Sequence, residues 1–340
     1  MPRTVVLVTG ANGEIGRSLL QTLARDGGFD AVTLDLTPLP DSMRSLVVAS
    51  YAGNIMDRYL LDQLAAHHEV DMVFHLAALL STRGERDPEL AHQVNVEGTL
   101  NVLRMAQNQS GRLGRPVRFL FPSSIAVYGL PSLEEKHKVG AVREEQWNVP
   151  ITMYGCNKLY CEHLGRYFTF HARQLGALST AARLDFRALR FPGLISADTV
   201  PTGGTSDFGP EMIHAAAKGI PYTSFVGPEA KIPFMAMPDA VHALMGLARA
   251  DRERLSSCVY NIRAFSPSAG EIADRVKRAF PQAQIEYAPD PVRSHIVASW
   301  PEDLDDARAR AEWGWKPAYD WDRAFDEYLV PSVKARYAKS

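Results

Sequence analysis

The chain has 340 residues, of which 46% are hydrophobic, and its formal net charge is −2. This length suits one large α/β domain with a smaller lobe, and the near-neutral charge gives no reason to expect nucleic acid or an anionic membrane as a partner. The N-terminus runs directly into a buried-strand pattern, so we expect neither a targeting segment nor a membrane span. The composition favours a cytoplasmic protein that binds small molecules.

The cysteine and histidine residues give no indication of a metal site. Cys156, Cys161 and Cys258 form no C-x-x-C pair, which argues against a disulfide framework and against a thiolate zinc site. No two histidines have the His-x-x-x-His spacing of a helical zinc site. We therefore expect no metal cofactor.

Strand and helix patterns alternate through the first half of the chain. Residues 5–8 are a continuous apolar run rich in β-branched side chains, which is typical of a strand buried on both faces of a parallel sheet. A turn and an apolar-periodic helix follow, and Gly27 and Gly28 end that helix. Later patterns predict strands at 31–35, 70–78 and 117–122 and a helix at 95–109. The alternation predicts an α/β fold with a doubly wound parallel Rossmann sheet.

The turn after the first strand predicts a dinucleotide site. Gly10, Gly13 and Gly16 form a G-x-x-G-x-x-G pattern between a buried strand and a helix, where missing side chains allow a tight turn and a close approach of pyrophosphate. Asp35 ends the second strand and is placed to accept hydrogen bonds from an adenosine ribose. Its carboxylate would repel a 2′-phosphate, so NAD is favoured over NADP; the alternative is a solvated loop aspartate.

Other cofactor contacts are expected beside the glycine turn and at the ends of later strands. Asn54 and Ile55 are placed to contact adenine, although any surface turn looks similar, and the small Ala77 and Ala78 would line the cofactor with their backbone. The predicted NAD-binding set is Gly10, Asn12, Gly13, Glu14, Ile15, Gly16, Asp35, Asn54, Ile55, Leu76, Ala77, Ala78, Asn95, Tyr154 and Lys158.

Beyond residue 190 the chain changes to Pro- and Gly-containing loops and shorter helices. We interpret 1–190 as an NAD-binding Rossmann domain and 191–340 as mainly a smaller C-terminal substrate-binding lobe. The boundary is not clean, because 259–262 has the pattern of a strand that returns to the main sheet and 266–272 begins like a capped helix. Segments from about 236–265 are therefore expected to return to the first domain.

Tyr154 and Lys158 predict where the chemistry occurs. Four residues apart on a helix, they lie on one face, so the ammonium can stabilise a phenolate that is otherwise a poor base near neutral pH. Ser123 and Ser124 follow a predicted strand and offer a hydroxyl for the reacting oxygen. Such a trio is suited to oxidising an alcohol.

Several motifs together resemble the extended short-chain dehydrogenase/reductase superfamily, which includes sugar-nucleotide epimerases and dehydratases. These motifs are the glycine turn, residues 75–78, 95–99 and 123–129, and Tyr154-x-x-x-Lys158. Further segments are similar to the L-threonine 3-dehydrogenase branch of that superfamily: 189–196, 201–208, 232–240, 299–308 and 312–317. The Gly-Gly-Thr-Ser-Asp sequence at 203–207 is the most specific of them.

The resemblance implies NAD-dependent oxidation of the β-hydroxyl of L-threonine to L-2-amino-3-oxobutanoate by hydride transfer. It implies that Tyr154 is the base, that Lys158 supports it and that Ser124, rather than Ser123, contacts the reacting oxygen. The implied substrate contacts are Ser81, Ser124, Tyr154, Gly204, Thr205, Ser206, Asp207 and Trp300. Among these, glycine amides and hydroxyls would meet the carboxylate, Asp207 the ammonium and Trp300 the methyl group.

Three alternatives stay open at this point. The substrate could be another β-hydroxy acid, because the sequence does not measure the pocket. The chain could be a sugar-nucleotide epimerase or dehydratase, against which the 203–207 sequence argues. It could also be a dinucleotide-binding sensor without chemistry, although Tyr154 and Lys158 are both present. Without the resemblance, 203–207 is equally a glycine turn before a capped helix.

Two segments and one single residue carry further expectations. Residues 131–140 look longer and more charged than the threonine dehydrogenase branch requires, and we interpret them as a solvated surface loop. Ala298 stands where that branch would have an acidic residue. The segment 81–86 is a possible lid loop.

The helix that carries Tyr154 suggests a homodimer. The superfamily commonly pairs through this helix, and large apolar groups continue it: Tyr160, Leu164, Tyr167 and Phe168. The same stripe would equally pack against the sheet.

Overall fold

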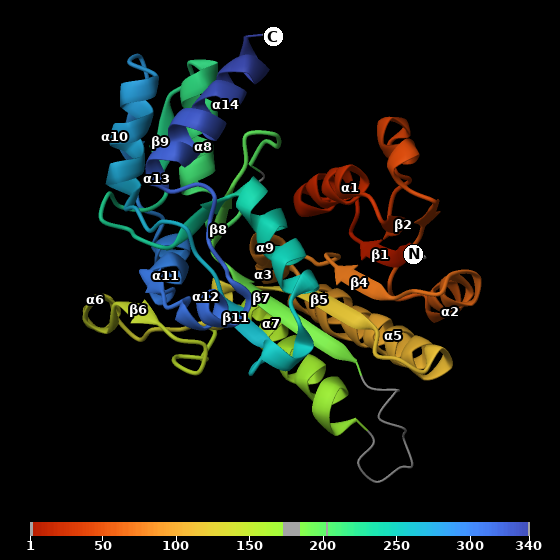
Figure 1. The fold of residues 1–340 in the computed structure, drawn as a ribbon. Helices are drawn as coiled ribbons and strands as arrows, with labels where there is room; N and C mark the ends of the chain where they lie inside the picture. Colours follow the sequence, from red (N-terminus) through yellow and green to blue (C-terminus); the bar gives the residue numbers. More distant parts are fainter. Residues whose placement is uncertain (1–2, 173–183, 202, 339–340) are drawn as a thin grey trace.

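The centre of the molecule is a seven-stranded sheet in which every neighbouring pair of strands is parallel (Figure 1). The computed structural model describes residues 3–172, 184–201 and 203–338. The strand order is β11-β7-β5-β4-β1-β2-β3. The strands are β1 (Thr4–Thr9), β2 (Phe29–Asp35), β3 (Ala49–Ala52), β4 (Met72–His75), β5 (Arg118–Ser124), β7 (Asp185–Phe191) and β11 (Val259–Asn261). This arrangement confirms the predicted doubly wound Rossmann sheet.

Helices cover both faces of the sheet because each has one apolar face. Leu19, Leu20 and Leu23 of α1 are buried, and α1 ends at Gly27, whose φ of 67° is in the left-handed region that glycine adopts without strain. One face carries α1 (Glu14–Asp26), α9 (Met237–Arg249) and α12 (Ala307–Trp313). The other face carries α2 (Arg58–His67), α5 (Thr99–Leu113) and α7 (Met153–Arg166).

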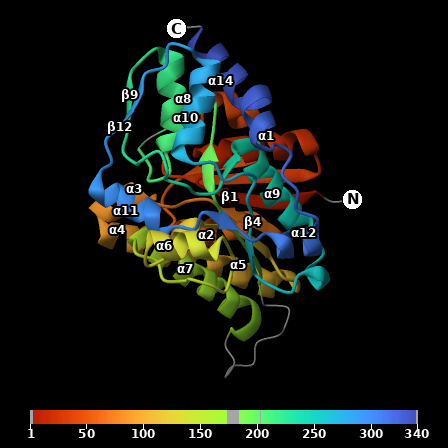
Figure 2. The ribbon, with the colours of Figure 1, turned by 90° about the vertical axis from the view of Figure 1, so that its left-hand side faces the viewer.

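Another group of helices and short strand pairs forms a separate hydrophobic core beside the sheet (Figure 2). Its helix α10 begins with a capping box between Ser268 and Glu271, as the sequence pattern at 266–272 indicated. The lobe contains α8 (Phe208–Lys218), α10 (Ala269–Ala279), α11 (Pro291–Ser299), α13 (Trp321–Arg323), η7 (Ala324–Leu329) and α14 (Val330–Tyr337), with the strand pairs β8 (Gly193–Ile195) with β10 (Phe234–Ala236), and β9 (Tyr222–Ser224) with β12 (Ile285–Tyr287).

Shorter elements connect these layers. They are η1 (Asp41–Leu46), α3 (Ser81–Arg86), α4 (Pro88–His92), η2 (Gln93–Gly98), η3 (Ile125–Val127), α6 (Leu133–Val139), β6 (Ala141–Val142), η4 (Tyr167–His171), η6 (Arg252–Arg254) and β13 (Asp303–Leu304). β6 pairs in parallel with β13, which joins the segment after β5 to the segment after α11.

The segment 131–140, expected as a solvated surface loop, lies mostly at the surface but contains helix α6 and one buried side chain. The hydroxyl of Ser132 accepts a hydrogen bond from the amide of Glu135 and starts helix α6. The Lys136 side chain is 2% exposed, and its Nζ donates to the carbonyl of Val297 at 3.2 Å. Because the amine meets a helix carbonyl while its methylenes pack, this charged residue belongs to the interior.

The possible lid at 81–86 is a helix rather than a loop. Gly84 of α3 is buried, and a Cβ atom there would lie 3.4 Å from the Cβ of Ala91. The hydroxyl of Thr82 donates to the carbonyl of Gly203 at 2.8 Å. Close packing on one side and a hydrogen bond on the other therefore fix this segment.

The apolar stripe on α7 and η4 divides between the core and the surface. Phe168 is buried and Leu164 packs against the core, whereas Tyr160 and Tyr167 are 52% and 43% exposed.

Within the described ranges, no helix is long and apolar enough to cross a membrane. The same part of the chain contains no cluster of three metal-ligating side chains.

Candidate active site

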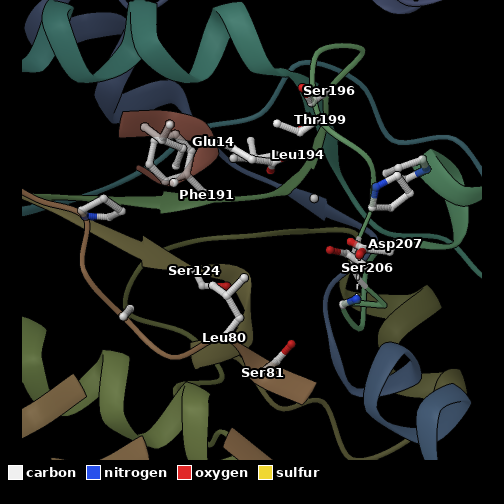
Figure 3. Close-up of a pocket in the computed structure, with 18 of the residues that line it drawn as sticks. Glu14, Leu80, Ser81, Ser124, Phe191, Leu194, Ser196, Thr199, Ser206 and Asp207 are labelled. Carbon is white, nitrogen blue, oxygen red and sulfur yellow. Dashed lines mark hydrogen bonds between the residues drawn. The ribbon is translucent and has the colours of Figure 1, made fainter. Parts of the chain in front are cut away.

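A cavity of about 690 Å³ lies between the carboxyl ends of the central strands and the lobe. Figure 3 shows Leu80, Ser81 and Ser124 on one side of it and Ser206 and Asp207 on another. In open parallel sheets, ligands bind where the strand order reverses, which here is between β1 and β4. The cavity occupies this position.

The glycine turn after β1 fits a dinucleotide. Gly10 has a φ of 68°, and a Cβ there would lie 2.6 Å from the backbone nitrogen of Ala77. A Cβ on Gly16 would lie 2.6 Å from the carbonyl of Ala11. No side chain caps the amides at the start of α1, which leaves them available to an anion. The turn thus provides the close backbone approach that a pyrophosphate needs.

Asp35 is fixed at the edge of this turn. Its carboxylate accepts hydrogen bonds from the backbone amides of Asn12 at 2.9 Å and Thr37 at 3.3 Å. Asn54 bonds to the amide of Met56, and Ile55 is buried beneath Gly98. Asp35, Asn54 and Ile55 stand outside the lining of the main cavity, on the side where an adenosine would extend from the glycine turn.

Asn95 does not line the cavity, and its contact with the cofactor stays a prediction. Its side chain is buried, its Oδ1 accepts from the amide of Leu79 at 2.7 Å and its Nδ2 donates to the Leu79 carbonyl at 3.0 Å. Both amide atoms are therefore used to hold the segment that follows β4. Ala77 also stands behind the lining, against Gly10.

Tyr154, Ser124 and Lys158 line the same cavity. Thr152 caps α7 by accepting from the amide of Gly155, so Tyr154 lies in the first turn of the helix. Burial raises the pKa of Tyr154 to about 12, and a hydrogen bond with Ser124 offsets part of this rise. Ser124 and Tyr154 are thus already in contact.

Lys158 is buried and points into the protein rather than pairing with a phenolate. Its Nζ donates to the carbonyl of Pro122 at 2.6 Å and lies 5.5 Å from the centroid of the Tyr154 ring. Burial lowers the pKa of Lys158 to about 8. The ammonium does not overcome the effect of burial on Tyr154, so the protein alone keeps this tyrosine protonated near neutral pH.

Buried polar groups support the trio from beneath. The hydroxyl of Ser123 donates to Glu162, which forms two hydrogen bonds with the guanidinium of Arg190. His75 lies between the hydroxyls of Thr9 and Thr99 at 2.8 and 2.9 Å. Burial lowers the pKa of His75 to about 3, so this histidine is neutral.

The 203–207 sequence forms a loop that is held from both sides. The hydroxyl of Thr205 donates to Ser81 at 3.1 Å, and Arg293 of α11 donates to the carbonyl of Gly204 at 3.1 Å. The Asp207 carboxylate accepts a hydrogen bond from the Gly204 amide at 2.6 Å. That amide is therefore occupied, although the sequence had suggested that it binds the substrate carboxylate. Gly204, Thr205, Ser206 and Asp207 all line the cavity, whereas Thr202 lies outside the described residues.

Trp300 lines the cavity from the end of α11 and is 3% exposed. Glu14 lines it from the first turn of α1, where burial and the nearby Asp207 raise its pKa to about 7. Sequence reasoning assigned no role to several other lining residues. Arg17, Leu80, Thr199 and Arg336 stand outside any recognised motif, whereas Phe191, Leu194 and Ser196 lie in the segment 189–196 that resembled the threonine dehydrogenase branch.

Comparisons with known proteins agree with this geometry. Residues 6–262 match the NAD dependent epimerase/dehydratase family. Over 93% of its length the chain is 33% identical to the mitochondrial L-threonine 3-dehydrogenase of Bos taurus and covers 79% of that protein.

Two solved structures are also similar. The GalE-like L-threonine dehydrogenase from Cupriavidus necator, in its holo form, has 34% identity and a TM-score of 0.83, with 98% of this chain and 99% of that chain covered. A monomeric L-threonine 3-dehydrogenase from a metagenome has 30% identity and a TM-score of 0.84, with the same coverage of 98% and 99%. The chain therefore belongs to the NAD dependent epimerase/dehydratase family.

Proposed function

We propose that this protein is an NAD-dependent L-threonine 3-dehydrogenase that needs no metal. The observation that carries the proposal is that one cavity contains the glycine turn, the Tyr154–Ser124 pair and the 203–207 loop. The relatives named as threonine dehydrogenases support the choice of substrate. In this proposal 1–190 binds NAD, with α9 and β11 returning to the same sheet, and the rest of 191–340 covers the substrate.

Tyr154 removes the proton of the β-hydroxyl, and Ser124 holds the same oxygen while it becomes a carbonyl. A bound oxidised nicotinamide would supply the acceptor for the hydride of Cβ and a positive charge in the site. That charge matters because burial raises the pKa of Tyr154 to about 12 even with the opposing hydrogen bond of Ser124. Lys158 contributes a second positive charge from beneath, and its bond to Pro122 fixes its position.

Polar groups of the lobe and of α3 recognise the two charged ends of an amino acid. Asp207 meets the substrate ammonium, and its bond to the Gly204 amide fixes the carboxylate in place. The hydroxyls of Ser81, Thr205 and Ser206 meet the substrate carboxylate, which is costly to desolvate without donors. Trp300 supplies an apolar surface for the methyl group.

The proposal extends to a homodimer that pairs through the exposed Tyr160 and Tyr167 side of α7 and η4. One similar threonine dehydrogenase is described as monomeric, so the number of subunits has to be measured. Sedimentation of the full chain at several concentrations would distinguish a dimer from a monomer.

The direct test is NADH formation at about 340 nm, the absorbance band of the reduced nicotinamide. L-Threonine, L-allo-threonine, L-serine, phenylserine and a UDP-sugar are compared with NAD and with NADP. We expect turnover with L-threonine and NAD. Turnover only with another β-hydroxy acid would place the error in the pocket of Thr205, Asp207 and Trp300. Conversion of the UDP-sugar without net NADH would overturn the dehydrogenase assignment in favour of an epimerase.

A further inference from the structure

Arg336 of the last helix and Arg17 of the first helix line the same cavity, although they are far apart in the sequence. Arg17 follows the glycine turn in α1, whereas Arg336 is in α14. In both ribbon views α14 lies across from α1 at one end of the molecule, and α7 lies towards the other end (Figures 1 and 2). Arg17 lies beside the glycine turn through its bond to the Asn12 carbonyl, Arg336 lies beside Asp198, and both residues line the one cavity.

Neither guanidinium is neutralised within the described ranges. Arg336 donates to the backbone carbonyl of Asp198 at 2.8 Å, and Arg17 donates to the backbone carbonyl of Asn12 at 2.9 Å. Arg17 and Arg336 take part in none of the ion pairs found among the described residues. Each bond uses only part of a guanidinium that has five donors, so both groups keep donors for an anion.

Contacts between the C-terminal segment and the cavity wall hold Arg336 in position. Tyr337 bonds to the buried His214 at 2.8 Å, and the other ring nitrogen of His214 lies 3.2 Å from the carbonyl of Ser196. The amide of Ala197 donates to the hydroxyl of Tyr328 at 3.1 Å. α14 is thus joined to the same wall segment that Arg336 contacts.

We propose that Arg336, together with Arg17, binds the diphosphate of the dinucleotide, so that the C-terminal helix forms part of the cofactor site. The proposal rests on the dinucleotide binding proposed above and adds a residue from the opposite lobe. A diphosphate at the glycine turn is the anion that this part of the cavity accommodates, and arginine matches phosphate oxygens with paired donors.

Glu14 is the acidic group on the same wall and faces the same ligand. The raised pKa of Glu14, about 7, reduces its repulsion of a phosphate near neutral pH. Asp207 contributes to this shift, and Asp198 meets Arg336 with its backbone only. The two arginines therefore leave this region favourable to an anion.

The test compares dissociation constants of NADH, ADP-ribose and adenosine for the unaltered protein, Arg336→Gln and Arg336→Lys. Lys334→Gln is the matched control, because Lys334 carries the same charge on the same helix, lies over the Phe280 ring and lines no part of the cavity. NADH is followed by its fluorescence, and the other two ligands by calorimetry. We expect Arg336→Gln to weaken NADH and ADP-ribose by about tenfold, with a smaller effect at high salt, and to leave adenosine unchanged.

Arg336→Lys should keep part of the affinity, and Lys334→Gln should keep all of it. Equal losses for adenosine and ADP-ribose would overturn the proposal, because they would indicate a general disturbance of the site. Unchanged ADP-ribose binding with a raised KM for the amino acid would assign Arg336 to the substrate and overturn it too. Because binding is measured without turnover, a protein that binds NADH through Arg336 but does not oxidise threonine would refute only the proposed function.

Discussion

The buried ion pair beneath the site gives a sharp prediction for Glu162→Gln. Glu162 and Arg190 have side chains 4% and 3% exposed, and they meet through two hydrogen bonds of 2.9 and 2.6 Å. The substitution keeps the shape of the side chain but leaves the Arg190 charge buried without a carboxylate. Breaking a buried pair in this way costs about 3–5 kcal/mol.

The expected loss can be converted to a melting temperature. The unfolding entropy of globular proteins, about 2.1 cal/mol/K per residue, gives about 0.7 kcal/mol/K for a chain of this length, so Tm should fall by about 4–7 °C. The assay is thermal unfolding followed by circular dichroism, with urea unfolding as a second measure of the free energy. Asp41→Asn is the matched control, because its partner Arg44 is 64% exposed and Asp41 is 95% exposed. Loss of such a surface pair should cost less than about 1 kcal/mol.

A double substitution distinguishes the effect of an unpaired buried charge from a simple loss of packing. Replacing both Glu162 and Arg190, with Leu and Met, removes the charge together with its partner. We expect the double variant to be more stable than Glu162→Gln, because the Arg190 charge is removed together with its carboxylate partner. A Glu162→Gln protein that loses under about 1 kcal/mol, or a double variant that is the least stable of the three, would refute the account of the buried pair.

Three further predictions concern the site. Tyr154→Phe should lower turnover by about 10² to 10⁴ while the dissociation constant of NADH stays nearly the same, and retained turnover would remove Tyr154 from the role of base. Asp35→Ala should weaken NAD by about tenfold and reduce the preference over NADP, as judged from kcat/KM with each cofactor; an unchanged ratio would contradict the ribose assignment. The pKa of Glu14 is raised in the folded chain from its ordinary 4.5 to about 7, so its contribution to stability is full below about pH 4.5 and is lost as the pH rises through about 7. Glu14→Gln should therefore make Tm less dependent on pH across this window, and an identical pH profile would show that the carboxyl is not held in its protonated form.

Local patterns were enough to predict the sheet and the glycine turn. The apolar run before Gly10 predicts a buried strand, and the break at Gly27 predicts the end of α1, because each depends on neighbouring residues only. The order in which β7 and β11 join the sheet depends on pairing between distant residues. The pattern at 259–262 indicated a returning strand but not its partner.

The parts of the site that sequence reasoning missed depend on contacts across the molecule. Lys136 looked solvated because its neighbours are charged, yet it is buried and its ammonium donates a hydrogen bond to the Val297 carbonyl of α11. Asn95 belongs to a motif of the superfamily, but the backbone of Leu79 occupies its amide. Arg336 has no motif around it, and only the docking of α14 brings it to the cavity. A linear pattern does not record which distant group completes a hydrogen bond.

The hydrogen bonds between α3 and the 203–207 loop affect how fast a ligand enters. Thr82 bonds to Gly203, and Thr205 bonds to Ser81, so two hydrogen bonds join the sheet side of the cavity to the lobe. At a net value of about 1 kcal/mol each, the two bonds together favour the joined arrangement by about 2 kcal/mol. Stopped-flow mixing of NADH with Thr82→Val tests this, because a faster observed association is expected and an unchanged rate would argue against it. Exchange of one ligand for another would then be limited by how often the two sides separate, and not by how often ligands reach the surface.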